Sequence, residues 1–211
     1  MKKSITLWLA SGLLCLFILL TFLVQVIDVK TIGPQGSAIG FATFNLFIFK
    51  LTGVHLLIYH ITDWMGLIPI AIAFIFAFMG LIQWTTRRSL IRVDCSIRLL
   101  GIFYLILIAI YLFFEMVIIN RRPILIDGYL EASYPSSHVL MVLCLMGSAN
   151  MAIRKQTIHR ILKVIFIVFS DLVMILTLVG RIVSGVHWAT DIIAGVLFAS
   201  SWLLYYKHMI Q

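Results

Sequence analysis

Charged residues are scarce in this chain of 211 residues. They make up 11% of the sequence, whereas a soluble domain has about 25%, and 63% of the residues are hydrophobic. The apolar residues fall in long blocks, and a bilayer-spanning helix needs about 20 of them in succession. The scarcity of charge therefore excludes an ordinary soluble domain and predicts a single all-α, polytopic membrane domain over residues 1–211.

Cysteines are also few, and carboxylates do not cluster. Cys15 and Cys144 lie inside apolar blocks and Cys95 lies in a basic loop, so we expect free thiols rather than a disulfide framework. No carboxylate cluster indicates a metal ion, and we expect metal-independent chemistry without a cofactor. The net charge of +8 does not indicate a nucleic-acid partner, because the basic residues lie in short loops between apolar blocks, a pattern that sets membrane topology.

Six apolar blocks predict a six-transmembrane helix bundle. The first block lacks the small-residue cleavage site of a secretory signal, so we expect it to remain as a span. Next, residues 28–63 hold a Gly/Pro turn and then apolar residues at helical spacing, which predicts one or two interfacial helices. They would cap the bundle or guide a lipid tail. The spans are expected at residues 7–27, 64–84, 99–119, 135–153, 164–179 and 190–206.

Basic residues give the chain its expected orientation. With six spans, the segments that carry most of them fall on one side of the membrane, and the positive-inside rule makes that side cytoplasmic. We therefore expect an integral plasma-membrane protein with both termini in the cytoplasm. The extracytoplasmic face then holds residues 28–63, 120–134 and 181–189. The basic residues counted are Lys2, Lys3, Arg87, Arg88, Arg92, Arg98, Arg154, Lys155, Arg160, Lys163 and Lys207.

The stretch from Gly180 to Asp191 carries three reactive side chains in an otherwise apolar region. His187 and Asp191 are four residues apart and would share one face of a helix. The carboxylate can then bind one imidazole nitrogen and leave the other free to react. Arg181 adds a planar, permanently charged group that suits phosphate. These residues predict half of a phosphoryl-transfer site on the outer face.

A second polar motif, from Tyr134 to His138, stands at the head of the expected fourth span. Pro135 is favoured at the first position of a helix, and the free N–H groups that follow it would bind phosphate together with the helix dipole. The hydroxyls of Ser136 and Ser137 add donors, and His138 would lie at the rim. A plain helix start with polar capping residues is the alternative for this motif taken alone.

Two adjacent arginines follow the third span, in Asn120-Arg121-Arg122-Pro123. Cations at the outer edge break the positive-inside trend. They either snorkel toward lipid phosphates or clamp a substrate phosphate. Beside the other two motifs we predict the clamp for Arg122, whereas both alternatives stay open for Arg121.

The three motifs, in this order, resemble the signature of the type 2 phosphatidic acid phosphatase superfamily. Its members are integral-membrane lipid phosphatases that share their site with vanadium-dependent haloperoxidases. The resemblance covers the chain from about the second span to the C-terminus. The matching residues are Arg122-Pro123, Pro135-Ser136-x-His138 and Arg181-x5-His187-x3-Asp191.

The resemblance implies a role for each matched residue. His187 would attack phosphorus and form a phosphohistidine, and Asp191 would orient it. His138 would be the general acid for the leaving group. The phosphate oxygens would be bound by Arg122, Ser136 and Arg181, with Ser137 and Arg121 as further candidates.

Three positions depart from the family pattern. Glu115 stands where the first motif usually begins with a lysine, Ser137 replaces a glycine, and Gly180 replaces the serine before the last motif's arginine. Substrate choice and rate are the properties that these changes affect, since the histidines, the aspartate and two arginines are retained. Glu115 could also pair with either arginine of the first motif. Asp171, inside the fifth span, is expected to hydrogen-bond to a neighbouring span while neutral, and a role in proton transfer or substrate binding is the alternative.

The sequence therefore predicts a phosphoric or diphosphoric monoester hydrolase that acts on lipid phosphates among the membrane lipids, at the extracytoplasmic face. A lipid-to-lipid phosphotransferase with the same intermediate is the alternative. A small membrane transporter is a remote one, because its polar residues would lie near the midplane. Isoprenyl diphosphate, phosphatidylglycerol phosphate and phosphatidic acid are all candidate substrates, and the sequence makes no prediction of the oligomeric state.

Overall fold

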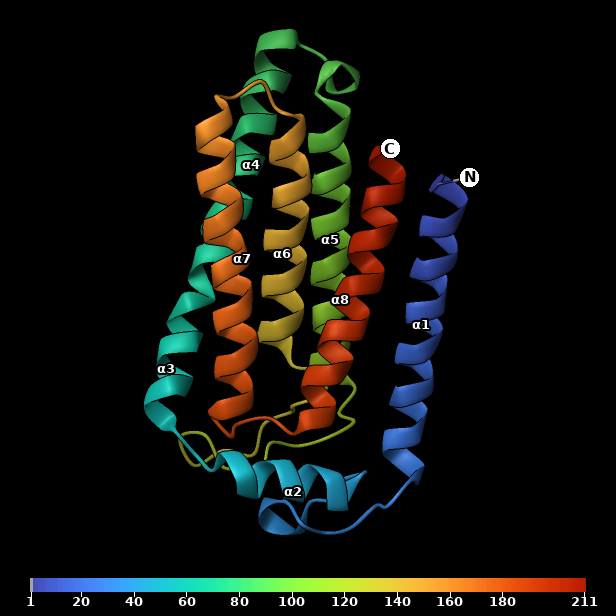
Figure 1. The fold of residues 1–211 in the computed structure, drawn as a ribbon, viewed down its shortest axis with the longest axis vertical. Helices are drawn as coiled ribbons and strands as arrows, with labels where there is room; N and C mark the ends of the chain where they lie inside the picture. Colours follow the sequence, from blue (N-terminus) through green and yellow to red (C-terminus); the bar gives the residue numbers. More distant parts are fainter. Residues whose placement is uncertain (1) are drawn as a thin grey trace.

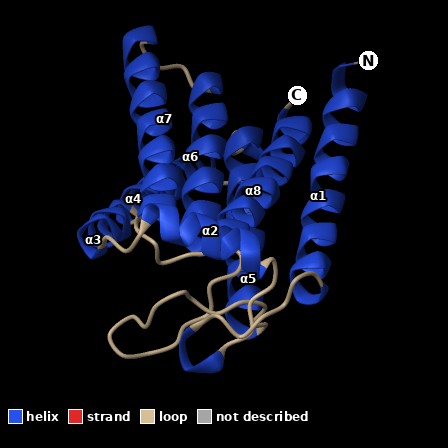
Figure 2. Cartoon of the chain, turned by 60° about the horizontal axis from the view of Figure 1, so that its bottom comes forward, coloured by secondary structure: helices blue, strands red, loops and turns tan. Residues whose placement is uncertain are grey.

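The computed structural model describes residues 2–211, which form a bundle of long helices (Figure 1). Within these residues there are no strands, only three isolated bridges between loop residues (Figure 2). The predicted all-α, six-span architecture is confirmed. Met1 and the side chain of Lys2, part of the basic segment expected before the first span, lie outside the described part. The spans are α1 (Lys2–Val26), α3 with α4 (Leu56–Met65 and Leu67–Arg87), α5 (Cys95–Met116), α6 (Ser137–Lys155), α7 (Arg160–Val183) and α8 (Ala189–Ile210).

The second span begins earlier than the sequence predicted. Helix α3 starts at Leu56 and leads into α4 through Gly66, which keeps helical backbone angles (φ −60°, ψ −20°). The two helices together form one apolar path of 32 residues. Residues 56–63 are therefore helical and continue into this apolar path, ahead of the start expected at residue 64.

The fourth span begins later than expected, at Ser137, and Pro135 lies before the helix. Ser136 is the N-cap of α6, with a ψ of 108° that is not helical. Pro135 therefore precedes the helix instead of occupying its first position. The backbone N–H of Ser136 donates to the carbonyl oxygen of Asp191 (3.0 Å), so it is not one of the free donors that we expected.

Helix α2 (Ala42–Thr52) lies across one end of the bundle, which we call the α2 end (Figure 1). The buried side chain of Asn45 joins it to the start of α8. Its Nδ2 donates to the carbonyl of Gly40 (2.8 Å) and to Oγ1 of Thr190 (3.0 Å), and its Oδ1 accepts from the backbone N–H of Thr190 (3.1 Å). The interfacial segment thus caps the bundle, and the cap is fixed to the helix that follows the last polar motif.

Helices α6 and α8 form the centre of the bundle. In α6, 61% of the most apolar stretch is buried, against 17% in α1 and in α7. Close packing drives helix association in a bilayer, because lipid tails are as apolar as the side chains themselves. Gly147 of α6 provides such contact, since a Cβ there would lie 2.7 Å from Cδ1 of Leu203 on α8. The Nδ2 of Asn150 donates to Oδ1 of Asp171 (3.0 Å), which joins α6 to α7 as predicted.

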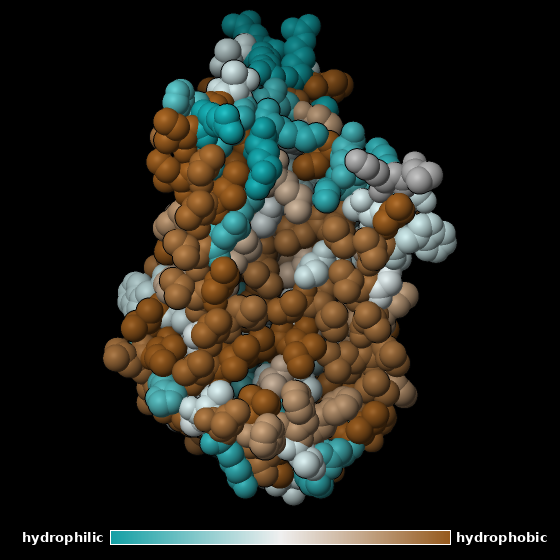
Figure 3. All heavy atoms as spheres, in the orientation of Figure 1, coloured by the Kyte–Doolittle hydropathy of each residue, from teal (hydrophilic) through white to brown (hydrophobic). Residues whose placement is uncertain are grey.

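The polar surface gathers at the two ends of the bundle. Figure 3 shows a broad apolar belt around the middle of the visible face and hydrophilic residues above and below it. The α4–α5 link, the α6–α7 link and both chain ends lie toward the end opposite α2 (Figure 1). We call this the basic end, because those segments carry most of the lysines and arginines.

Candidate active site

Three segments meet at the α2 end: the loop between α5 and α6, the first turn of α6, and the short link between α7 and α8. The link spans residues 184–188, so the polar residues on either side of it stay close together. Gly185 makes the turn with a φ of +68°, and a Cβ there would lie 2.0 Å from the carbonyl oxygen of Gly53. A residue other than glycine would therefore displace the link from the segment between α2 and α3.

His187 and Asp191 are neighbours in this link and the first turn of α8. Nδ1 of His187 lies 3.8 Å from Oδ2 of Asp191, which is within ion-pair range but longer than a hydrogen bond. Asp191 is fully buried. Its Oδ1 accepts from Nδ2 of Asn120 (3.1 Å), and its Oδ2 accepts from the backbone N–H of Trp188 (3.0 Å). The carboxylate is thus held in place beside the imidazole.

The surroundings of His187 favour its neutral imidazole form. Burial, with the nearby charges of Arg122 and Arg181, holds the pKa of His187 well below its usual range. The backbone of Ser133 lies near the ring and favours its charged form, but less strongly than burial and the arginines disfavour that form. A neutral ring with Nδ1 toward a carboxylate leaves the lone pair of Nε2 for nucleophilic attack.

Two arginines from different segments are buried beside this histidine. Arg181 is fully buried and Arg122 is 6% exposed. Both guanidinium groups lie over the ring of Tyr59, at 5.1 Å and 5.9 Å from its centroid. Nη1 of each arginine and Oγ of Ser136 are buried with no hydrogen-bond partner in the described part of the chain. Buried donors of this kind call for an acceptor, and we call Arg122, Ser136 and Arg181 the cationic cradle.

Two acidic side chains pair with the cradle, and the sequence analysis identified neither of them. Nε of Arg122 lies 3.0 Å from Oε2 of Glu131. Nη2 of Arg181 donates to Oδ1 of Asp63 (3.0 Å), and the same oxygen lies 2.9 Å from Nε2 of His138. The expectation that Glu115 pairs with an arginine of the first motif is wrong for Arg122, because Glu131 takes that place.

Arg121 and Ser137 lie at the margins of this arrangement. Nη1 of Arg121 donates to the carbonyl of Leu130 (3.0 Å), and its backbone carbonyl accepts from Nε1 of Trp188 (2.7 Å). The guanidinium group therefore supports the α5–α6 loop instead of facing the cradle. Ser137 lines a cavity beside His138.

That cavity, of about 370 Å³, opens from the site along α4 and α6. Asp63, Ser137 and His138 form its polar part. Its other walls are mainly apolar, so a polar head and a hydrophobic tail would both find matching surfaces. The remaining lining residues are Gly66, Leu67, Ile70, Tyr111, Met141 and Val142.

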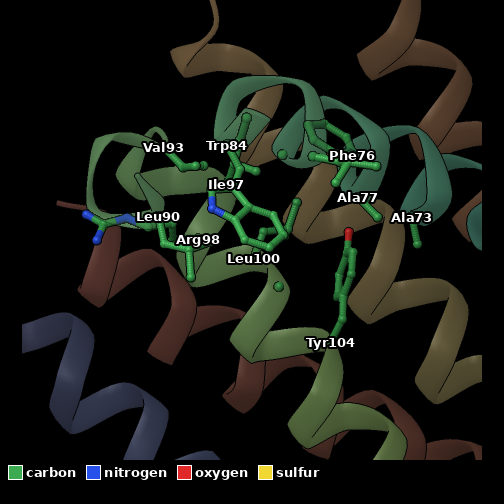
Figure 4. Close-up of a pocket in the computed structure, with 13 residues that line it drawn as sticks. Ala73, Phe76, Ala77, Trp84, Leu90, Val93, Ile97, Arg98, Leu100 and Tyr104 are labelled. Atoms are coloured by element: carbon green, nitrogen blue, oxygen red, sulfur yellow. The ribbon is translucent and has the colours of Figure 1, made fainter. Parts of the chain in front are cut away.

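A second cavity, of about 320 Å³, lies between α4 and α5 toward the basic end. Figure 4 shows Phe76, Trp84 and Tyr104 around it, with Arg98 among the residues that line it. None of the three polar motifs contributes to it. Across the described residues, no group of three or more His, Cys, Asp or Glu side chains is arranged to hold a metal ion.

Comparison with known proteins matches the site region to one family. The model of the PAP2 superfamily matches residues 117–211. A similar solved structure is that of a transmembrane PAP2 type phosphatidylglycerolphosphate phosphatase from Bacillus subtilis. It is 16% identical, with a TM-score of 0.58 over 94% of this chain and 93% of that one. At this identity the likeness concerns the fold. No curated protein matches the chain.

Proposed function

On the premise that this chain is a PAP2-type membrane protein, we propose that it hydrolyses lipid phosphates through a phosphohistidine. The premise rests on the family match over residues 117–211 and on the similarity of the fold to that of a transmembrane PAP2 phosphatase. The observation that carries the proposal is the cationic cradle beside His187. It holds two buried guanidinium groups and the buried hydroxyl of Ser136. Nη1 of each arginine and this hydroxyl lack partners among the described residues. A phosphoryl group would supply the missing acceptors.

The proposed reaction has two displacements at phosphorus. Nε2 of His187 attacks, a P–N bond forms, and the bond from phosphorus to the lipid oxygen breaks. His138 gives a proton to that oxygen, so that the lipid leaves as an alcohol or, from a diphosphate, as a monophosphate. A water molecule, giving its proton to His138, then attacks the phosphohistidine and releases inorganic phosphate. Arg122, Ser136 and Arg181 bind the phosphoryl oxygens as charge builds on them.

The cavity beside His138 supports a lipid substrate. It joins the polar side chains of the site to apolar walls on α4 and α6. A head group bound in the cradle would leave its hydrocarbon tail along those walls and in the bilayer. Helix α2, fixed across the same end by Asn45, adds an apolar wall near the membrane surface.

The distribution of basic residues supports an extracytoplasmic site. Lysines and arginines concentrate in the links at the end opposite the cradle, and such segments remain in the cytoplasm. Both termini would then be cytoplasmic, and the substrate would be a lipid of the outer leaflet.

Release of phosphate from a panel of lipid phosphates, by the purified protein in detergent, tests the proposal. The panel contains phosphatidic acid, phosphatidylglycerol phosphate and an isoprenyl diphosphate, with EDTA added to remove metal ions. We expect hydrolysis of at least one, and its loss in the His187→Ala and His138→Ala variants. A radiolabelled substrate offered with lipid alcohols separates hydrolysis from transfer, since a phosphotransferase would label the acceptor. Activity retained in both variants would refute the proposal.

A further inference from the structure

One carboxylate oxygen joins two parts of the site that would otherwise repel each other. Oδ1 of Asp63 accepts a hydrogen bond from Nη2 of Arg181 (3.0 Å) and lies 2.9 Å from Nε2 of His138. Asp63 comes from α3, outside the three motifs that carry the family resemblance. This inference rests on the proposed function: we propose that Asp63 is a positioning residue that aims His138 as the general acid and favours its protonated form.

The charges around His138 explain why it needs this carboxylate. The groups that act electrostatically on its ring are Asp63 from α3, Arg181 from α7, His187 from the α7–α8 link and Arg122 from the α5–α6 loop. Burial disfavours an imidazolium most, and the like charges of the two arginines add to this effect. Among the described residues, Asp63 is the acidic side chain whose oxygen lies within ion-pair distance of His138. Without it, the general acid would lose its proton more readily.

The same contact fixes which nitrogen of His138 would serve as the donor. Nε2 faces the carboxylate, whereas Nδ1 is buried without a hydrogen-bond partner in the part of the chain described. When a carboxylate occupies one ring nitrogen, the other is the one that remains to exchange a proton with a substrate. The imidazolium therefore donates the proton at Nδ1 to the leaving oxygen, and the ring becomes neutral. Nε2 keeps its own hydrogen, and Asp63 stays negatively charged beside it.

Small residues allow α3 to approach closely enough for this contact. A Cβ at Gly180 would lie 2.4 Å from Cγ2 of Thr62, the residue before Asp63. A Cβ at Gly66 would lie 3.2 Å from Cδ2 of His138. Gly180 is also the position where the family pattern has a serine. The chain thus lacks a hydroxyl at position 180. Because no side chain fills this space, α3 can pack against α7 and bring the carboxylate of Asp63 into the site.

The test compares Asp63→Asn with the unchanged protein on two kinds of substrate. Asparagine keeps the shape and an acceptor oxygen but removes the charge. With a lipid phosphate, whose alkoxide leaving group needs a proton, we expect kcat at neutral pH to fall about 10- to 100-fold. With 4-nitrophenyl phosphate, whose leaving group needs no proton, we expect a change of less than about threefold. KM for the lipid should change little, because Asp63 acts through His138.

The pH profile supplies a readout that a structural role would not move. Asp63 favours the protonated form of His138, so its removal lets that proton leave at lower pH. The basic limb of the kcat profile should therefore shift downward by about 1 to 3 pH units in Asp63→Asn, the range expected for an opposite charge at this distance. Asp63→Glu should restore part of the shift. Asp127→Asn, which changes an exposed acid in the α5–α6 loop, is the matched control and should leave the profile unchanged.

The outcomes separate this inference from the proposed function. If Asp63→Asn matches the unchanged protein at every pH, or loses activity equally on both substrates, the positioning role is wrong while lipid hydrolysis stands. If His138→Ala loses no more kcat/KM, which reports the first displacement, on the lipid than on 4-nitrophenyl phosphate, His138 is not the general acid, and this inference fails with that part of the mechanism. If the unchanged protein hydrolyses no lipid phosphate, the proposed function fails first. A thermal unfolding curve in detergent confirms that each variant is folded.

Discussion

Nδ1 of His187 and Oδ2 of Asp191 are 3.8 Å apart, and the carboxylate is the better anchored of the two. Asn120 and the backbone of Trp188 each donate a hydrogen bond to Asp191, whereas the contact of the His187 ring with the backbone of Ser133 falls short of hydrogen-bond geometry. A small movement of the imidazole would close the hydrogen bond, so the alignment of the nucleophile depends on the groups that hold Asp191.

Replacing Asn120 by alanine tests this dependence. The change removes the donor to Oδ1 of Asp191 and leaves a buried carboxylate with one partner fewer. A hydrogen bond to a charged group contributes about 1.5–3 kcal/mol, so kcat should fall about 10- to 100-fold. Steady-state kinetics on the preferred lipid phosphate give the value. Asn45→Ala, another buried amide at the α2 end, should lower thermal stability without a comparable loss of kcat in the folded fraction, and equal losses in the two variants would contradict the role of Asn120.

The lowered pKa of His187 predicts a tolerance of acid. Because burial and two arginines disfavour its imidazolium form, the free protein keeps a neutral nucleophile below the usual histidine pKa of about 6.5. The acid limb of kcat/KM that belongs to His187 should therefore lie below that value. Arg122→Gln removes one of the charges that lower this pKa, so the limb should move to higher pH. Both proteins are measured on the same substrate, so that ionisation of the substrate affects the two pH profiles equally. An acid limb that does not move in Arg122→Gln would contradict its assignment to His187.

Gly180→Ser tests whether the close approach of α3 matters. The added Cβ would lie 2.4 Å from Cγ2 of Thr62, so α3 would be pushed away from α7 and the carboxylate of Asp63 from its partners. We expect hydrolysis of the lipid phosphate to fall about 10-fold or more, since general acid catalysis contributes at least that much. Thr62→Ser removes Cγ2, so the double variant should recover activity. Full activity in Gly180→Ser alone would show that α3 can shift without loss of hydrolysis.

The two adjacent arginines should differ in their effects. Arg122 is buried in the cradle, whereas the guanidinium of Arg121 is hydrogen-bonded to the carbonyl of Leu130. Arg122→Ala should lower kcat/KM about 100- to 1,000-fold, as is typical when a donor to developing charge is lost. Arg121→Ala should change it only a few-fold. Initial rates at low substrate decide the matter, and similar losses in both would place Arg121 in the phosphate site after all.

The sequence was most informative where chemistry depends on short spacing. The pair His187 and Asp191, and the arginine before them, are joined by a link so short that they cannot separate in the fold. The six spans followed from the length of the apolar blocks, because a bilayer requires about 20 residues whatever the packing. The all-α architecture was therefore predictable without knowledge of any contact.

Contacts between distant segments were not predictable in the same way. Asp63 lies 75 positions before His138 and 118 before Arg181, and no periodicity connects them. The only signal was an acidic residue beside Trp64, at the end of the bundle that already held the motifs. Similarly, two adjacent arginines look alike in the sequence, and only the path of the α5–α6 loop determines which one faces the cradle.

The covalent intermediate is the central claim, and trapping it is the most direct measurement. The protein is mixed with a lipid phosphate carrying ³²P, denatured in alkali within the first turnovers and digested for peptide mapping. We expect an alkali-stable, acid-labile label on the peptide that contains His187, and no label in His187→Ala. His138→Ala should retain the label longer, because the water that clears it lacks its base. Label on another residue, or turnover of the lipid with no label at His187, would contradict the account.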